Sequence, residues 1–139
     1  MWQTRDRAMA KAIGIGGAFM KAADPQKLAS WYLEVFQLGD EFEPSNVGGF
    51  GVSFLKSQFP ESAYVRFSIE GNESIHFPGQ FMFNLIVDDI QGVLAQVEDR
   101  DGKVLRRNFQ LEGVGEFAWI EDIEGNRVEL WQPIDGDAT

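Results

Sequence analysis

Apolar and polar residues alternate most clearly near the end of the chain, between residues 116 and 133. Two short alternating runs there are separated by residues 122–126, where Gly125 and Asn126 both tolerate the positive φ that a tight turn needs. The pattern predicts a hairpin of two short strands.

The second strand of this hairpin should have two different faces, because successive side chains of a strand point in opposite directions. Val128 and Leu130 would face a core that is covered by a helix. Arg127, Glu129 and Trp131 would face the other way. A carboxylate, a guanidinium and an indole then share a surface that the chain must cover or fill with a ligand, so Glu129 is the first candidate for a functional residue.

Earlier in the chain, apolar residues recur with the period of a helix. Asp24 suits a helix N-cap, and Pro25 suits the first helical position. The apolar residues that follow are spaced i, i+3, i+4 and i+7, and they are Leu28, Trp31, Tyr32 and Val35. Leu38 and Gly39 end the predicted helix.

The same pattern starts again 65 positions later, where Asp89 is the N-cap of a second predicted helix that ends at Gly102. Its apolar stripe is Ile90, Val93, Leu94 and Val97. Further strands are predicted around the two helices, at residues 12–22, 47–56, 62–70, 81–87 and 103–109. The chain is thus predicted to repeat one strand-helix-strand-strand-strand unit.

The two predicted units cover residues 12–70 and 81–134, and each is too small to bury its own apolar face well. Pairing them predicts an α+β fold in which two tandem βαβββ units form a curved mixed sheet with a cup, with the helices on the outer face. The whole is expected to be a single domain over residues 12–134. Residues 1–11 are expected to be a frayed extension, and residues 135–139 a tail.

The amino-acid composition limits the expected cellular compartment and the kinds of reactive or metal-binding site that the chain can form. The chain has no cysteine, which excludes disulfides, thiolate metal sites and a cysteine nucleophile. The N-terminus lacks the apolar run of a signal peptide, and no segment approaches the roughly 20 apolar residues of a membrane span. We therefore expect a cytoplasmic protein without a membrane partner.

The formal net charge is −10, because 22 acidic residues outnumber 12 basic ones. Nucleic-acid partners are not expected, since phosphate binding needs clustered Lys and Arg. The acidity is explained by solubility, or by an acidic cleft for a cationic ligand. The one histidine, His76, lies in a polar loop over residues 71–80, where a surface role is more common than that of a ligand or base.

Several short motifs occur together in this chain: Asp24-Pro25, Trp31-Tyr32, Asn84 to Asp89, Gly115-Glu-Phe117 and Asp122 to Trp131. In this arrangement the chain resembles the vicinal oxygen chelate superfamily, which includes glyoxalase I, bleomycin resistance proteins and extradiol dioxygenases. The resemblance covers residues of about 12–134 and is nearest to the small glyoxalase-like members. Ile123 replaces a proline that is common in the closing turn. Such motifs are informative about fold and much less about function.

The resemblance implies a place to look for a metal, because metal-dependent members bind a divalent ion through the first and last strands of each unit. The corresponding positions here are Gly17, Met82, Glu129, and either Phe67 or Ser68. Glu70 falls late in its predicted strand. Glycine has no side chain and a thioether is a soft ligand, so Glu129 is the one convincing ligand. We expect no bound metal and no other cofactor.

Without a metal, the cup remains a concavity that alternate strand residues would line. The candidate ligand-binding residues are Phe19, Met82, Asn84, Arg127, Glu129 and Trp131, with Gly17 beside them. Glu129 contacts a ligand, or is simply paired with Arg127 or Asn84. Trp131 and Trp119 are most simply core or interface aromatics.

Three functions remain open from the sequence. The first is small-molecule binding in the cup, as the resemblance to bleomycin resistance proteins implies. The second is an enzyme, a lyase, isomerase or dioxygenase of the vicinal oxygen chelate type, that uses Glu129 with or without a divalent metal. The third is a structural or partner-binding module. By analogy with the superfamily, a homodimer is expected.

Overall fold

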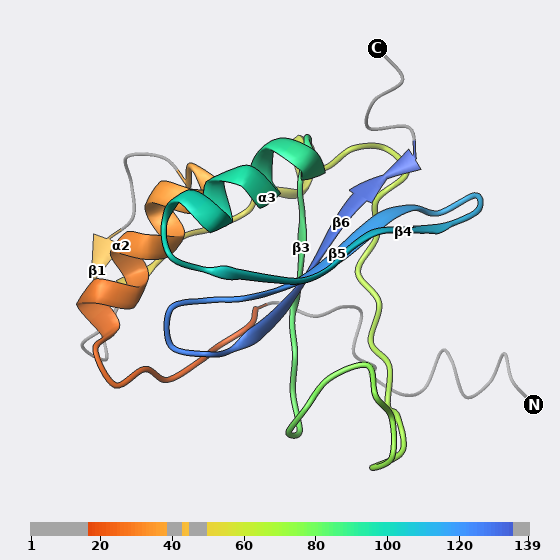
Figure 1. Ribbon diagram of the computed structural model, residues 1–139. Coiled ribbons are helices and arrows are strands. Elements are labelled where there is room, and N and C mark those ends of the chain that lie inside the picture. The colour runs from red at the N-terminus through yellow and green to blue at the C-terminus, as the bar shows by residue number, and fades with distance from the viewer. Residues whose placement is uncertain (1–16, 39–42, 45–49, 135–139) are drawn as a thin grey trace, which may run out of the picture.

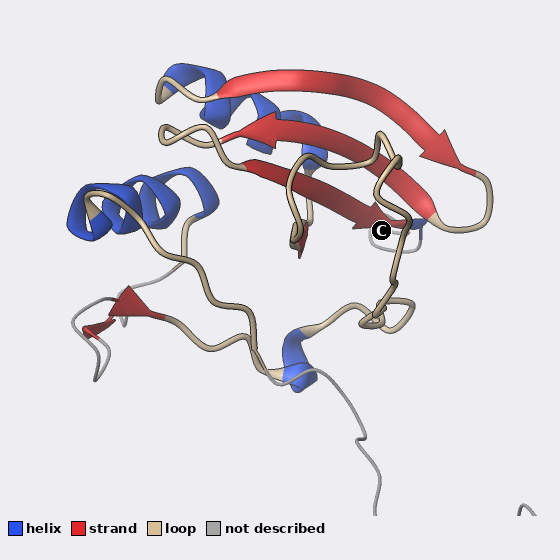
Figure 2. Ribbon diagram, turned by 90° about the horizontal axis from the view of Figure 1, so that it is seen from below, coloured by secondary structure: helices blue, strands red, loops and turns tan. Residues whose placement is uncertain are grey.

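The computed structural model describes residues 17–38, 43–44 and 50–134. Within these residues the elements are two helices, a four-stranded sheet, a two-stranded ribbon and one turn of 3-10 helix (Figures 1 and 2). This confirms the α+β class. No helix in these residues is long and apolar enough to cross a membrane.

The second predicted unit is complete. Its elements, in chain order, are β3 (Asn84–Ile86), α3 (Ile90–Asp99), β4 (Lys103–Leu111), β5 (Gly115–Glu121) and β6 (Arg127–Pro133). The sheet order is β3-β6-β5-β4, with β3 parallel to β6 and the other two pairs antiparallel. Figure 2 shows that the sheet is curved. The predicted strands, the helix and the closing hairpin of this unit are confirmed.

The turn between β5 and β6 is held by one carboxylate. Oδ1 of Asp122 accepts hydrogen bonds from the backbone N–H groups of Glu124 and Asn126, at 2.8 and 3.0 Å. Gly125 has a φ of 86°, which the turn requires and which glycine adopts without strain. The hydroxyl of Tyr32 donates to Oδ2 of Asp122 at 2.7 Å, so the turn is also tied to the first helix.

Both helices begin as predicted. In α2 (Pro25–Phe36), the side chain of Asp24 accepts a hydrogen bond from the backbone N–H of Lys27, and in α3 that of Asp89 accepts one from Gly92. The two predicted apolar stripes are buried. They form one core with Ala118, Ile120, Val128 and Leu130 of the sheet. The predicted core face of the hairpin is therefore confirmed.

The first unit differs from its prediction. Residues 17–22 and 62–70 are not strands. Within the described residues 50–56, the strand is β2 (Phe50–Gly51), paired with β1 (Glu43–Pro44). Residues 12–16 lie outside the described part. The strand predictions for 62–70 and for the described part of 12–22 are therefore wrong.

The reason lies in what a strand needs besides alternation. A strand is stable only when a neighbouring edge accepts its backbone hydrogen bonds, and sequence alternation does not report whether such an edge exists. Phe67 and Ile69 alternate with polar residues, yet they remain 74% and 87% exposed, without a covering layer in the described chain. The segment over residues 52–83 instead runs alongside the sheet without a strand, and its one regular element is the 3-10 turn Lys56–Gln58 (Figures 1 and 2).

Candidate ligand-binding site

Glu129 lies near the centre of the sheet, on the face away from the helices. It is opposite Asn84 of β3 on one side and Trp119 of β5 on the other. Nδ2 of Asn84 donates to its Oε1 and Nε1 of Trp119 donates to its Oε2, both at 2.9 Å. Glu129 is only 8% exposed. Of the two pairings that the sequence leaves open for this carboxylate, the structure has the one with Asn84.

The third contact of Glu129 comes from a distant loop. Nε2 of His76 lies 2.9 Å from Oε2 of Glu129, and Nδ1 lies 2.9 Å from Oε2 of Glu70. The hydroxyl of Ser74 donates to the other oxygen of Glu70 at 2.6 Å. We call residues 70–76 the strap. His76 lies in a loop, as predicted, and its side chain is 34% exposed, but its imidazole joins two carboxylates, a contact that the sequence did not predict.

The charges of the strap follow from these contacts. Burial lowers the pKa of His76, but its hydrogen bonds with Glu70 and Glu129 outweigh burial and leave the pKa above its ordinary value. Hydrogen bonds from Ser74 and from His76 hold the pKa of Glu70 below its ordinary value. The two carboxylates beside the ring therefore favour the protonated imidazole over the neutral one.

Aromatic rings surround Glu129 on the sheet. We call Phe109, Phe117, Trp119 and Trp131 the aromatic face. Ring centroids are 5.6 Å apart for Phe109 and Trp119, and 6.0 Å apart for the stacked pair of Phe117 and Trp131. Tyr64, from the irregular segment, covers Trp131 with its centroid at 5.0 Å. Phe117 and Trp131 are buried, while Phe109 and Trp119 are half-buried, so only part of this face is open beside the carboxylate. Partly exposed rings beside a carboxylate suit a small organic molecule with an aromatic part.

Two arginines border the same face. Nη1 of Arg127 donates to the backbone carbonyls of His76 and Ile75, at 3.2 and 3.5 Å, and so ties the strap to β6. Its Cζ lies 5.0 Å from the ring centroid of Trp119, and that of Arg106 lies 5.3 Å from it. In the part of the chain that the structure describes, the buried Nε of Arg127 has no hydrogen-bond partner.

The predicted site residues are thus partly brought together. Asn84, Arg127, Glu129 and Trp131 all contribute to the arrangement around the aromatic face. Phe19 is 96% exposed. Neither Phe19 nor the half-buried Met82 has a hydrogen bond or ring contact with those four among the described residues.

Sequence reasoning missed Trp119, His76 and Glu70 as parts of the site. Trp119 could have been found, because a hairpin that turns at residues 122–126 sets it opposite Glu129. No local signal points to His76, which is 53 positions away from Glu129.

The residues present do not fit the metal site that the resemblance implies. Among the described residues, no group of three or more His, Cys, Asp or Glu is arranged to hold a metal ion. Both ring nitrogens of His76 face carboxylate oxygens, and Oε2 of Glu129 already has two partners. Catalytic zinc, by comparison, usually has three protein ligands.

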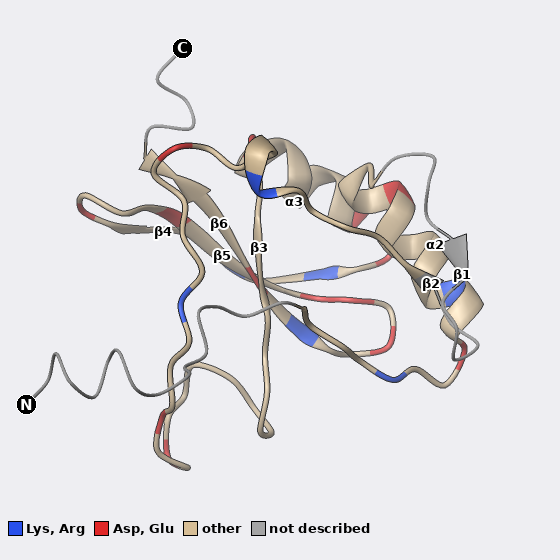
Figure 3. Ribbon diagram, turned by 180° about the vertical axis from the view of Figure 1, so that it is seen from behind, with Lys and Arg blue, Asp and Glu red and all other residues tan. Residues whose placement is uncertain are grey.

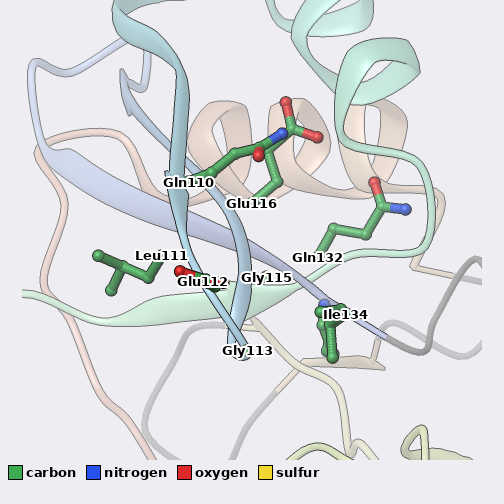
Figure 4. Close-up of a pocket in the computed structure, with 9 residues that line it drawn as sticks. Gln110, Leu111, Glu112, Gly113, Gly115, Glu116, Gln132 and Ile134 are labelled. Carbon is green, nitrogen blue, oxygen red and sulfur yellow. The ribbon is translucent and has the colours of Figure 1, made fainter.

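Two surface depressions lie elsewhere. One of about 500 Å³ is at the far end of the β4–β5 hairpin (Figure 4), and its lining includes Gln110, Glu116, Gln132 and Ile134. Another, of about 360 Å³, lies between the end of α2 and the start of α3. Glu129 lines neither of them. Acidic positions are spread over helices, hairpin turns and loops rather than gathered at one of these places (Figure 3).

Comparison with known proteins gives matches in structure only. No protein-family profile and no curated protein sequence matches the chain. Among solved structures, it is similar to TnmS3, an antibiotic binding protein from Streptomyces sp. CB03234, with 22% identity, a TM-score of 0.54, and coverage of 89% of this chain and 99% of that one. A hypothetical protein from S. aureus gives 16% identity, a TM-score of 0.53, and coverage of 90% and 99%.

The chain has the vicinal oxygen chelate fold. The likeness covers nearly the whole of both neighbours, so it confirms the resemblance at the level of fold. A glyoxalase family protein from Bacillus cereus also matches, with 16% identity and a TM-score of 0.39, over 48% of this chain and 46% of that one. At identities of 16% and 22%, the S. aureus protein and TnmS3 share the fold alone with this chain, and a common ligand or reaction is not implied.

Proposed function

We propose that this protein binds a small organic molecule on the aromatic face, beside Glu129, without a metal. The observation that carries the proposal is the state of Glu129. Its carboxylate is nearly buried, accepts hydrogen bonds from Asn84 and Trp119, and is bordered by indole and phenyl rings. A buried carboxylate with fixed neighbours is costly to keep, and a recognition role accounts for it. The antibiotic binding described for TnmS3 is consistent with this use of the fold.

The test is a binding screen with aromatic natural products and metabolites, read by thermal shift and then by calorimetry. We expect a hit whose affinity falls at least about tenfold in Glu129→Ala, since hydrogen bonds to charged groups are worth about 1.5–3 kcal/mol. Glu73→Ala, an exposed carboxylate next to the strap's Ser74, is the matched control and should leave affinity unchanged. A ligand that binds Glu129→Ala as tightly as the parent protein would contradict the proposal.

The metal-free part of the proposal needs its own measurement. After dialysis against a chelator, we expect no thermal stabilisation by Mg, Mn, Fe, Co, Ni or Zn. Binding to the folded state alone would add about 2.7 kcal/mol at one hundred times Kd, which is easily seen. A stabilisation that disappears in Glu129→Ala would instead favour the alternative, a metal-dependent lyase, isomerase or dioxygenase.

An enzyme that uses Glu129 as a base without a metal is the weaker alternative. Asn84, Trp119 and His76 already fill three of the roughly four acceptor sites of the carboxylate, which leaves little room to take a proton from a substrate. Turnover of a screened ligand that is lost in Glu129→Gln would favour the enzyme over simple binding.

A further inference from the structure

The imidazole of His76 occupies the position beside Glu129 and Trp119 where a ligand of the proposed site would bind. Nε2 of His76 lies 2.9 Å from Oε2 of Glu129, and its ring centroid lies 5.9 Å from that of Trp119 at a tilt of 37°. The ring is planar, it carries polar nitrogens, and it rests beside an indole and against a carboxylate. The side chain is 34% exposed, so solvent reaches it.

The strap that carries His76 is held by few contacts. Glu70 and Ser74 anchor it within itself, and Nη1 of Arg127 anchors it to the sheet through two carbonyls. Ile75 remains 86% exposed, and the segment contains no helix or strand. Segments with few buried apolar contacts open locally at low free-energy cost. The strap can therefore leave the sheet without unfolding the core.

We propose that His76 occupies the recognition position of the site, and that the ligand carries a planar cationic group with N–H donors, such as an amidinium, guanidinium or protonated heterocycle, which takes its place. The inference rests on the proposed function and specifies its ligand class. When the strap lifts, Oε2 of Glu129 loses a donor while Oε1 keeps Asn84. A cationic N–H donor restores that hydrogen bond and the local charge balance. The indole of Trp119, whose ring centroid lies 5.9 Å from that of His76, would border the same group.

An anionic aromatic ligand is the rival, because Arg106 and Arg127 both lie near Trp119. These guanidinium groups are already placed over rings, and Arg127 also holds two carbonyls. A carboxylate brought beside Glu129 would face a buried like charge. The geometry therefore favours the cation.

The experiment uses three probes of one shape: benzamidinium, benzamide and benzoate, with charges of plus one, zero and minus one. Each is titrated into the full chain while the indole N–H resonance of Trp119 is followed by NMR. The variants are His76→Ala, which empties the position, and Glu70→Ala, which releases Nδ1 of the imidazole. Glu129→Gln removes the recognising charge, and Asn72→Ala is an exposed control on the strap.

We expect benzamidinium to shift the Trp119 resonance and to bind at least about tenfold tighter in His76→Ala than in the parent protein. Glu70→Ala should bind it more tightly too, by a smaller factor, and Asn72→Ala should match the parent. Glu129→Gln placed in the His76→Ala background should abolish the gain. If His76→Ala fails to fold, Glu70→Ala carries the comparison, and its spectrum reports its own folding.

Two results would overturn the inference while leaving the proposed function in place. One is benzamide or benzoate binding as well as benzamidinium at Trp119. The other is benzamidinium binding to His76→Ala and Glu70→Ala no better than to the parent protein. A different result, no shift at Trp119 for any probe or for any hit of the wider screen, would count against the proposed function itself.

Discussion

At the scale of single residues, the site depends on donors that keep one buried carboxylate satisfied. Trp119 and Asn84 come from the strands on either side of Glu129, so the sheet itself sets their position. His76 comes from irregular chain and is the replaceable partner. Hydrogen bonds to charged groups are stronger than neutral ones, and leaving a buried charge short of a donor is costly.

Trp119→Phe tests this directly, because it keeps an aromatic ring and removes the indole N–H that donates to Glu129. We expect the free energy of unfolding to fall by about 1–3 kcal/mol, measured by urea denaturation. Tyr64→Phe, at a side chain that is 53% exposed, should change it by less than about 0.5 kcal/mol. Equal stability of Trp119→Phe and the parent protein would show that this hydrogen bond contributes nothing.

The strap should also have a defined pH dependence. Because the pKa of His76 is raised on folding, its stabilising contribution is complete below its unfolded value of about 6.5 and is lost as pH rises through the folded value. Because the pKa of Glu70 is lowered, its contribution is present above about 4.5 and is lost as pH falls through its folded value. The strap is therefore best anchored between these limits.

His76→Gln removes the titrating group but keeps a polar side chain. We expect the stability difference between the parent protein and His76→Gln, from urea denaturation between pH 5 and 9, to be largest at the acidic end and to shrink as pH rises. The effect should be small, since His76 is about one-third exposed. A difference that stayed constant, or grew with pH, would contradict the assignment of an imidazolium to this contact.

At the scale of elements, the helices and the closing hairpin follow from local signals. Asp24 and Asp89 are N-caps, apolar stripes face the core, and the turn at Asp122 has the residues that its backbone demands. These signals act within a few residues, so the sequence alone carries them.

The first unit and the strap depend instead on contacts between distant segments. Alternation over residues 62–70 predicts a strand, but pairing needs an edge that no local pattern reveals. The contact between His76 and Glu129 likewise joins parts of the chain that are 53 positions apart. The strand positions of Asn84, Arg127 and Glu129 could therefore be predicted, while the residue that covers them could not.

The carboxylate of Asp122 connects the turn between β5 and β6 to α2. Asp122→Ala should therefore lower the free energy of unfolding more than most single substitutions. It removes the acceptor for two turn amides and leaves the buried hydroxyl of Tyr32 without its partner. We expect a loss of about 2–4 kcal/mol in urea denaturation, because buried groups left unpaired cost about 1–3 kcal/mol each. Asp99→Ala, on the exposed side of α3, is the control. A loss no greater than that of the control would show that the turn forms without the carboxylate.

At the scale of the whole molecule, the described chain exposes large apolar side chains in and around the strap. Phe67 and Ile69, before the strap, and Ile75 and Phe81, within and after it, are each at least 74% exposed. Exposed apolar surface of this extent is unusual for a monomer and commonly marks an interface. Together with the expectation from the vicinal oxygen chelate fold, this leads us to predict a homodimer in which a second copy covers these side chains.

Light scattering coupled to size-exclusion chromatography should therefore give twice the mass of one chain at micromolar concentration. Ile69→Glu should shift the protein to a monomer, because a charge cannot be buried in an apolar interface without a partner. Its unfolding should stay cooperative, since Ile69 is 87% exposed within one copy and contributes little to the core. Asn72→Glu, a change at another exposed position nearby, should remain a dimer. A parent protein of single-chain mass would reject the dimer, and the aromatic face would then meet its ligand without a second copy. If the parent protein is a dimer, the ligand affinity of Ile69→Glu shows whether binding depends on assembly.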